Sequence, residues 1–126
     1  MREILFRGKR KDNGKWVEGH YGEYYSGKEN VSCISIPKET ISGSLCYDVI
    51  PETIGQYTGL KDKNGTRIFD GDIVKVETAL VRGIFAVECS MGANFIVSHG
   101  ERRFFFGGRK SEVIGNIHDN PELLNK

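Results

Sequence analysis

The chain has 126 residues, a mass of 14.2 kDa, a formal net charge of +1 and 38% hydrophobic residues, which excludes a disordered chain and indicates one globular domain. Sixteen glycines, about 13% of the residues against a usual ~7%, favour many short strands joined by tight turns. No segment resembles a signal peptide or approaches the ~20 apolar residues of a membrane span. We therefore expect a cytoplasmic protein.

The N-terminal half begins with two apolar or aromatic-rich runs, at residues 4–8 and 15–21, on either side of Asn13-Gly14. Asn-Gly supplies the positive φ angles of a tight turn, so these runs predict a β-hairpin. Residues 22–30 are polar and contain two glycines, which predicts a loop. Three further apolar runs predict short strands, the first ended by Pro37; they lie at residues 31–36, 45–50 and 53–57.

The C-terminal half contains two more turn signals, Asn64-Gly65 and Asp70-Gly71-Asp72. Five short strand-like runs follow at a spacing of roughly ten residues; they are 73–77, 82–89, 94–98, 102–106 and 112–117. The prediction is a mainly β protein with little helix. An N-terminal hairpin subdomain over 1–69 precedes a small five-stranded SH3-like barrel over 70–126. A helix start at Asp119-Asn120-Pro121-Glu122 leaves room for only a short C-terminal tail.

The stretch TGLKDKNGTRIFDGDIV, residues 58–74, contains three aspartates but does not match a calcium loop. Counted from Asp62, glycine falls at position 4 and Ile73 at position 12, whereas an EF-hand needs glycine at 6 and glutamate at 12. We therefore interpret the stretch as a hairpin turn and the entry into a strand. At that entry, Asp72 is expected to accept hydrogen bonds from backbone N–H groups.

Other catalytic and metal motifs are also missing from the sequence. At residues 104–111 Arg109 occupies the place of the second glycine of a phosphate-binding loop. The three histidines and three cysteines have neither zinc-ligand spacing nor a recognised nucleophile signature. The cysteines are odd in number and far apart in sequence, which predicts reduced, buried thiols. No catalytic residue, metal ligand or cofactor is predicted.

Positive charge is concentrated in two segments, residues 1–15 and 102–110, each with a balance of +4. In ERRFFFGGRK, residues 101–110, arginines adjoin phenylalanines, and phosphate attraction with base stacking needs both types. On a strand, Arg103 and Phe105 would share one face. The candidate nucleic-acid contacts are Arg102, Arg103, Phe105, Arg109 and Lys110, with Arg10 and Lys11 from the N-terminal hairpin. The alternative is that the phenylalanines fill the core and the arginines are merely solvated.

Trp16 and the pair Tyr24-Tyr25 are candidates for contact with a partner. A single tryptophan in a small β protein is also a natural core residue. The two tyrosines lie in a polar, glycine-flanked segment and could form a recognition surface.

Three segments together resemble the YopX-like family of small phage and prophage proteins: FRGKRKDNGKWVEG (6–19), ETIGQYTGLKDKNGTRIFDGDIVKV (52–76) and VIGNIHDNPELL (113–124). The resemblance implies a phage or prophage origin and a bacterial cytoplasmic environment. It implies no activity and no functional residues.

Three classes of function remain open on the sequence alone. The first is a non-enzymatic accessory protein that binds a macromolecule, with nucleic acid as the partner of the basic segments. The second is a protein-interaction module, or a self-assembly module that forms a homo-oligomer, and it uses strand edges and residues 22–36. The third, a hydrolase or transferase, is supported only by scattered His, Cys and Asp residues.

Overall fold

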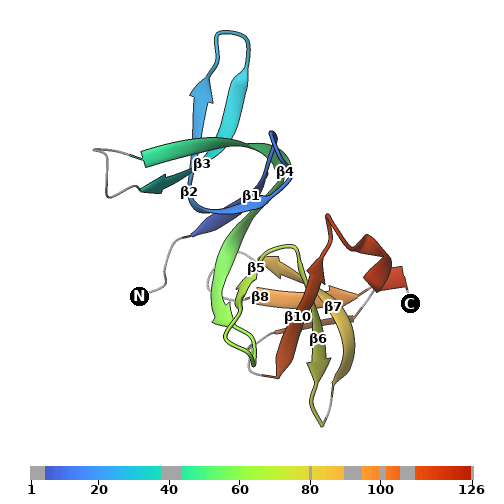
Figure 1. Ribbon diagram of the computed structural model, residues 1–126. Helices are drawn as coiled ribbons and strands as arrows, with labels where there is room; N and C mark the ends of the chain where they lie inside the picture. The colour runs from blue at the N-terminus through green and yellow to red at the C-terminus, as the bar shows by residue number, and fades with distance from the viewer. Residues whose placement is uncertain are drawn as a thin grey trace. The chain divides into compact units, whose positions relative to one another are not determined.

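In a computed structural model the described residues are 5–37, 44–79, 81–89, 95–99, 102–105 and 110–125. They form strands and one short 3-10 helix (Figure 1): β1 (Phe6–Arg10), β2 (Trp16–Tyr25), β3 (Asn30–Pro37), β4 (Ser44–Lys61), β5 (Arg67–Phe69), β6 (Asp72–Glu77), β7 (Arg82–Cys89), β8 (Phe95–His99), β9 (Arg102–Phe105), β10 (Ser111–Asn116) and η1 (Pro121–Asn125).

All strand pairs are antiparallel, and they make two five-stranded sheets of order β1-β2-β3-β4-β5 and β10-β6-β7-β8-β9. The predicted mainly β class with little helix is therefore confirmed. Within the described residues, no helix has the length and apolar character needed to cross a membrane.

The chain divides into two compact units, Met1–Gln56 and Tyr57–Lys126. The division falls inside β4, which is a single strand of 18 residues. The subdomain boundary expected from the turn pattern, between residues 69 and 70, follows β5 instead. β5 pairs with the last part of β4, through Tyr57 opposite Phe69, so both partners of that pairing lie in the second unit.

The N-terminal unit is built on the predicted β1–β2 hairpin, which is confirmed. Gly14 has a φ of 71°, and the amide of Arg10 donates to the carbonyl of Lys15 at 2.9 Å. β1 also pairs with β4, so strands β1 to β4 form a closed ring in which each strand pairs with the next. Buried apolar side chains fill this arrangement; they are Val17, Ile34 and Val49, flanked by Phe6, Ile36, Tyr47 and Ile54.

Two expectations for this unit were wrong. The loop predicted at residues 22–30 is strand as far as Tyr25, because β3 pairs along β2 up to that residue. The two runs separated by Pro51 are one strand, β4. The proline is accommodated because the register between β1 and β4 is irregular there: Lys9 lies opposite Ile50 and Arg7 opposite Gly55. Proline has no N–H group to donate to a neighbouring strand, and it is tolerated at such a bulge, where the regular hydrogen bonding is interrupted.

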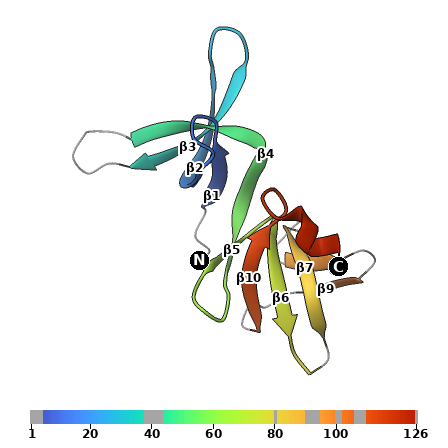
Figure 2. The same ribbon diagram turned by 45° about the vertical axis from the view of Figure 1, so that its right-hand side comes forward.

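Beyond the other strands, β2 and β3 continue together as a two-stranded ribbon. Residues 23–25 pair only with residues 30–32. Along β2, the pairing with β1 reaches no further than Gly19, and along β3, the pairing with β4 covers only Cys33 to Pro37. We call residues 23–32 the arm. Figures 1 and 2 show this hairpin projecting beyond β1 and β4 in both views.

The C-terminal unit contains the predicted five strands between residues 70 and 118, which are confirmed. Strands β6 to β9 follow one another as a meander, and β10 returns to pair with β6. The core consists of side chains at most 7% exposed; they are Ile68, Val74, Val76, Phe85, Val87 and Val97. Helix η1 begins at Pro121, where the sequence predicted a helix start.

Residues 58–74 form the two predicted turns, with φ of 83° at Gly65 and 93° at Gly71. Asp72 is 1% exposed and accepts a hydrogen bond from the amide of Phe69 at 2.8 Å, as expected. Asp62 is 6% exposed and accepts three backbone N–H bonds. Both carboxylates therefore stabilise the turns.

Candidate recognition surface

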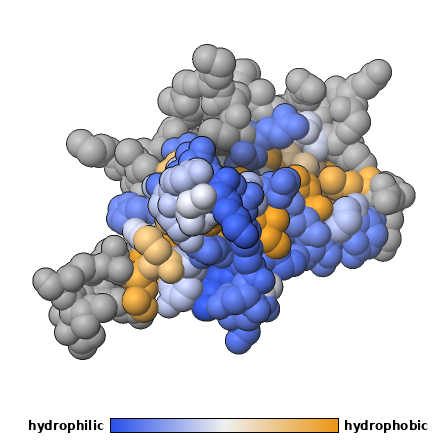
Figure 3. Space-filling model, turned by 90° about the horizontal axis from the view of Figure 1, so that it is seen from above, coloured by the Kyte–Doolittle hydropathy of each residue, from blue (hydrophilic) through white to orange (hydrophobic). Residues whose placement is uncertain are grey.

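Exposed aromatic side chains gather at the arm and the strand leading into it. Tyr21, Tyr24 and Tyr25 are 41%, 43% and 67% exposed. Together with Leu45 on β4 and Ile117, they are the large hydrophobic residues recorded as exposed within the described part of the chain. In the space-filling view of Figure 3 the visible surface is mostly hydrophilic, with apolar residues in small separate areas. Each of the three tyrosines combines an apolar ring with a polar hydroxyl and can therefore make both kinds of contact.

Tyr24 ties the arm to β4. Its hydroxyl donates to Oδ1 of Asp48 at 2.8 Å, although the two residues belong to strands on either side of β3. The register places Tyr24 opposite Val31 on the same face as Cys33. The hydrogen bond to Asp48 is the main cause that raises the pKa of Tyr24 above its ordinary value of 10.0. The phenol thus remains a donor at neutral pH and keeps its bond to the carboxylate.

The tip of the arm is closed by a hydrogen-bonded turn. The amide of Ser26 donates to the carbonyl of Glu29 at 2.9 Å, and Ser26 Oγ accepts from the amides of Lys28 and Glu29. Gly27 provides the positive φ of 96° that this turn requires. Because the turn satisfies its own backbone groups, the arm presents Tyr25 from an ordered hairpin.

Tyr21 is held at the base of the arm by a ring and a carboxylate. Its ring lies 5.6 Å from that of Phe6, and its hydroxyl donates to Glu23. The bond to Glu23 is the main cause that raises the pKa of Tyr21. Two of the three exposed tyrosines therefore have fixed hydroxyl groups.

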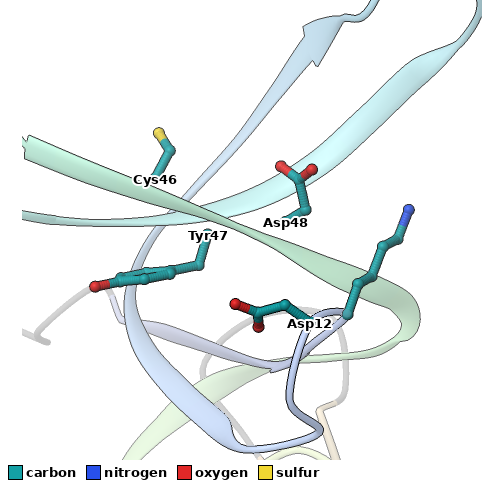
Figure 4. A pocket seen from close by; sticks show the side chains of 5 residues that line it. Asp12, Cys46, Tyr47 and Asp48 are labelled. Atoms are coloured by element: carbon teal, nitrogen blue, oxygen red, sulfur yellow. The ribbon is translucent and has the colours of Figure 1, made fainter.

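A shallow depression of about 320 Å³ lies beside the arm's attachment to β4. It is lined by Lys11, Asp12, Cys46, Tyr47 and Asp48. Figure 4 shows Cys46 and Asp48 on one side of β4 and Tyr47 on the other, toward Asp12. Its lining is mostly polar and charged, unlike the largely apolar pockets that bind small cofactors.

Cys33 and Cys46 lie side by side, with Sγ atoms 3.8 Å apart. Both are free thiols; Cys33 is 4% exposed and Cys46 is exposed. The prediction of reduced thiols is confirmed for both residues, and that of burial is confirmed for Cys33 but wrong for Cys46. The β3–β4 register brings the two together. Burial, followed by the hydrogen bond with Cys46, raises the pKa of Cys33 to about 11.

The residues predicted to bind nucleic acid are distributed over both units. Arg102, Arg103 and Phe105 belong to β9, where their backbones pair with His99, Ser98 and Ile96 of β8. The predicted strand at this segment is thereby confirmed over residues 102–105. Arg109 lies outside the described residues.

Of the other basic candidates, Lys11 and Lys110 lie in turns and Arg10 is the last residue of β1. Lys110 is exposed, and its carbonyl accepts the amide of Glu77 at 3.2 Å. Arg10 and Lys11 belong to the N-terminal unit. Lys11 is exposed, whereas Arg10 is paired with Asp12 at 2.6 Å and lies 4.1 Å over the Tyr47 ring.

Trp16, the other residue considered for partner contact, is half-buried under the guanidinium of Arg7, which lies 4.7 Å from its ring centre. In the described ranges no group of three or more His, Cys, Asp or Glu side chains is placed to hold a metal ion. The Tyr24–Asp48 bond and the thiol pair were missed by the sequence analysis, because both depend on how β3 pairs with its neighbours.

Comparison with known proteins gives a family and a fold. The model of the family described as YopX protein matches residues 5–125. The crystal structure of protein EF1440 from Enterococcus faecalis is similar at a TM-score of 0.55 and 24% sequence identity, over 98% of this chain and 99% of that one. No curated protein matches the sequence. The structural likeness concerns the fold alone.

Proposed function

Because the chain belongs to the YopX family, we propose that it is a phage- or prophage-encoded accessory protein that binds a macromolecule in the bacterial cytoplasm and catalyses no reaction. We propose further that the partner is a protein and that it contacts the arm. The observation that carries this proposal is the group of exposed tyrosines, Tyr21, Tyr24 and Tyr25, on one ordered hairpin.

Tyrosine suits a protein interface because it brings a large contact area at a small cost in side-chain entropy. The hydroxyls of Tyr24 in the arm and of Tyr21 at its base are already bonded to Asp48 and Glu23. A partner would therefore meet side chains that are largely fixed in advance, and preorganisation lowers the entropic cost of binding.

Charge favours a protein partner over nucleic acid at this surface. The exposed charged groups on the arm and in the neighbouring depression are four carboxylates and two lysines; they are Glu23, Glu29, Asp48, Asp12, Lys28 and Lys11. This local excess of negative charge repels a phosphate backbone. It complements a partner surface that carries arginine or lysine.

Pull-down from a bacterial host lysate tests the proposal, comparing the wild type with Tyr25→Ser and Tyr21→Ser. The matched control is Ile117→Ser, which removes a side chain of comparable exposure, 39%, outside the arm. We expect a retained protein that the arm variants lose at least tenfold and the control keeps, followed by direct titration with that purified protein. Retention that is equal for all variants would overturn the assignment to the arm.

Nucleic acid is the second candidate partner, favoured by the placement of Arg102, Arg103 and Phe105 on β9, the last strand of its sheet. The test is fluorescence anisotropy with DNA and RNA at two salt concentrations. The comparison variant replaces Arg102, Arg103, Arg109 and Lys110 by Gln. Salt-sensitive binding that this variant loses would support the basic segment, and no binding at low salt would exclude it.

We also propose that the second sheet closes as a small SH3-like barrel. Its support is the strand order, a four-stranded meander with the fifth strand returning beside the first. Small barrels of this kind bind peptides, proteins and nucleic acids alike, so the fold is compatible with either a protein or a nucleic-acid partner. Self-association through the arm is a third outcome, which light scattering of the purified chain detects.

A further inference from the structure

We propose that Cys33 and Cys46 form a reversible dithiol–disulfide pair, oxidised by a peroxide and reduced by small thiols. The carrying observation is the 3.8 Å separation of their sulfur atoms on neighbouring strands. This inference concerns the chemistry of the thiols and does not depend on the partner proposed for the arm.

The register explains why the two sulfurs meet. Cys33 lies opposite Asp48, and Cys46 opposite Ser35, so the cysteines are diagonal neighbours on one face of the β3–β4 pair. Gly22 lies opposite Cys33 on the other neighbouring strand, β2. A Cβ at Gly22 would be only 3.6 Å from the Cys33 sulfur, so the missing side chain leaves room beside the thiol.

The two thiols differ in a way that assigns their roles. Cys46 is exposed, so an oxidant in solution reaches its sulfur first. Cys33 is buried, and its S–H group is within hydrogen-bonding distance of the Cys46 sulfur. The raised pKa of Cys33 keeps that thiol protonated as the neighbouring donor. Cys46 is therefore the attacking residue and Cys33 the resolving residue.

With hydrogen peroxide as the oxidant, the reaction balances in two steps. The Cys46 sulfur attacks one peroxide oxygen, the O–O bond breaks, and the products are a sulfenic acid at Cys46 and one water. The Cys33 sulfur then attacks the Cys46 sulfur and loses its proton, the S–O bond breaks, and a second water leaves. The two thiols lose two electrons and two protons in total, and the peroxide is reduced to two waters.

The diagonal register also predicts that the disulfide is easily reduced. Diagonal neighbours have Cα atoms about 7–8 Å apart, slightly more than the ~4.4–6.8 Å of most disulfides. Bond formation therefore requires a small shift of β3 along β4. A bond formed under such constraint is reduced readily by dithiothreitol or glutathione.

Thiol counting by mass spectrometry tests the pair. The chain is treated with hydrogen peroxide, then alkylated in denaturant, and its peptides are mapped. Cys89→Ser removes the third cysteine and leaves the pair intact. We expect this variant to lose both alkylatable thiols, to yield a linked Cys33–Cys46 peptide, and to recover both thiols after dithiothreitol.

Cys46→Ser supplies the matched control, because Cys46 is exposed and its replacement leaves the buried Cys33 in place. This variant should form no intramolecular bond, and its circular dichroism should match the wild type. The proposal is overturned if the Cys89→Ser chain keeps both thiols under oxidation. It is equally overturned if that chain yields only sulfinic or sulfonic acids, or only disulfide-linked dimers.

Discussion

Replacing Asp62 by Asn or Ala should markedly destabilise the C-terminal unit. Its Oδ1 accepts the amides of Asn64 and Thr66, and its Oδ2 accepts the amide of Val113, all at 2.9 Å. The residue is 6% exposed. One carboxylate therefore holds the turn after β4 and fixes that turn to β10.

The size of the stability loss depends on which backbone amides lose their hydrogen-bond acceptor. The side chain of Asn has one acceptor oxygen, so either Val113 or the two turn amides would face an NH₂ group. A hydrogen bond to a charged group contributes about 1.5–3 kcal/mol. Asn64 and Thr66 are exposed and can turn to water, whereas Val113 is half-buried. We expect both variants to lose about 2–4 kcal/mol of the free energy of unfolding.

Urea unfolding followed by circular dichroism measures this loss, together with hydrogen exchange at the Val113 amide. Glu122→Gln is the control, because it makes the same carboxylate-to-amide change at an exposed residue of the same unit. Its effect should stay within about 0.5 kcal/mol. Should both Asp62 variants unfold like this control, with Val113 still protected, the assigned role of the carboxylate would be refuted.

Acid should reduce the stability that Asp62 gives to the C-terminal unit. Burial opposes ionisation of Asp62, but the amides of Val113, Thr66 and Asn64 outweigh it and lower the pKa below its ordinary value of 3.8. Because the pKa of Asp62 is lower in the folded chain, this carboxylate is protonated in the unfolded chain first as the pH falls. The stabilisation is complete above the unfolded pKa and is lost as the pH falls from about 4 through the folded pKa. Asp62→Asn should remove this contribution, which pH-dependent unfolding curves would show.

Two further predictions concern the N-terminal unit. Gly19→Ala should cost about 1–3 kcal/mol of the free energy of unfolding, because a Cβ there would overlap the carbonyl oxygen of Ser35. Gly22→Ala should change little, because its Cβ would meet only the Cys33 sulfur at 3.6 Å. Urea unfolding followed by Trp16 fluorescence compares the two variants, and equal midpoints would contradict the packing argument. Tyr24→Phe should cost at most about 1 kcal/mol, because its bond to Asp48 is exposed and water can replace it. The change should nevertheless speed hydrogen exchange of the arm amides, and unchanged exchange would mean that this bond does not tether the arm.

The turns were predictable because their chemistry is local. Asn13-Gly14, Asn64-Gly65 and Asp70-Gly71 place glycine where the observed φ is positive, at 71°, 83° and 93°. Two or three adjacent residues suffice for such a turn, whatever the rest of the chain does. The hairpins and the five strands of the second sheet followed from these signals and from apolar runs.

The features that were missed depend on pairing between distant strands. Residues 22–25 have a loop-like composition, yet they are strand because β3 supplies hydrogen-bond partners. Pro51 suggests an interruption, yet an irregular register lets β4 pass through it. Cys33 and Cys46 become neighbours only when the β3–β4 register is known. A one-residue shift in that register would place the two thiols on opposite faces of the sheet.

The double pairing of β1 has a consequence for the order of events during synthesis. β1 can form its hairpin with β2 from local contacts, but it also needs β4, where Phe6 lies opposite Gln56. Long-range closure carries an entropic cost that a hairpin avoids, and it is a slow step in folding. The apolar side of the first hairpin, including Val17, therefore stays uncovered until β4 has left the ribosome.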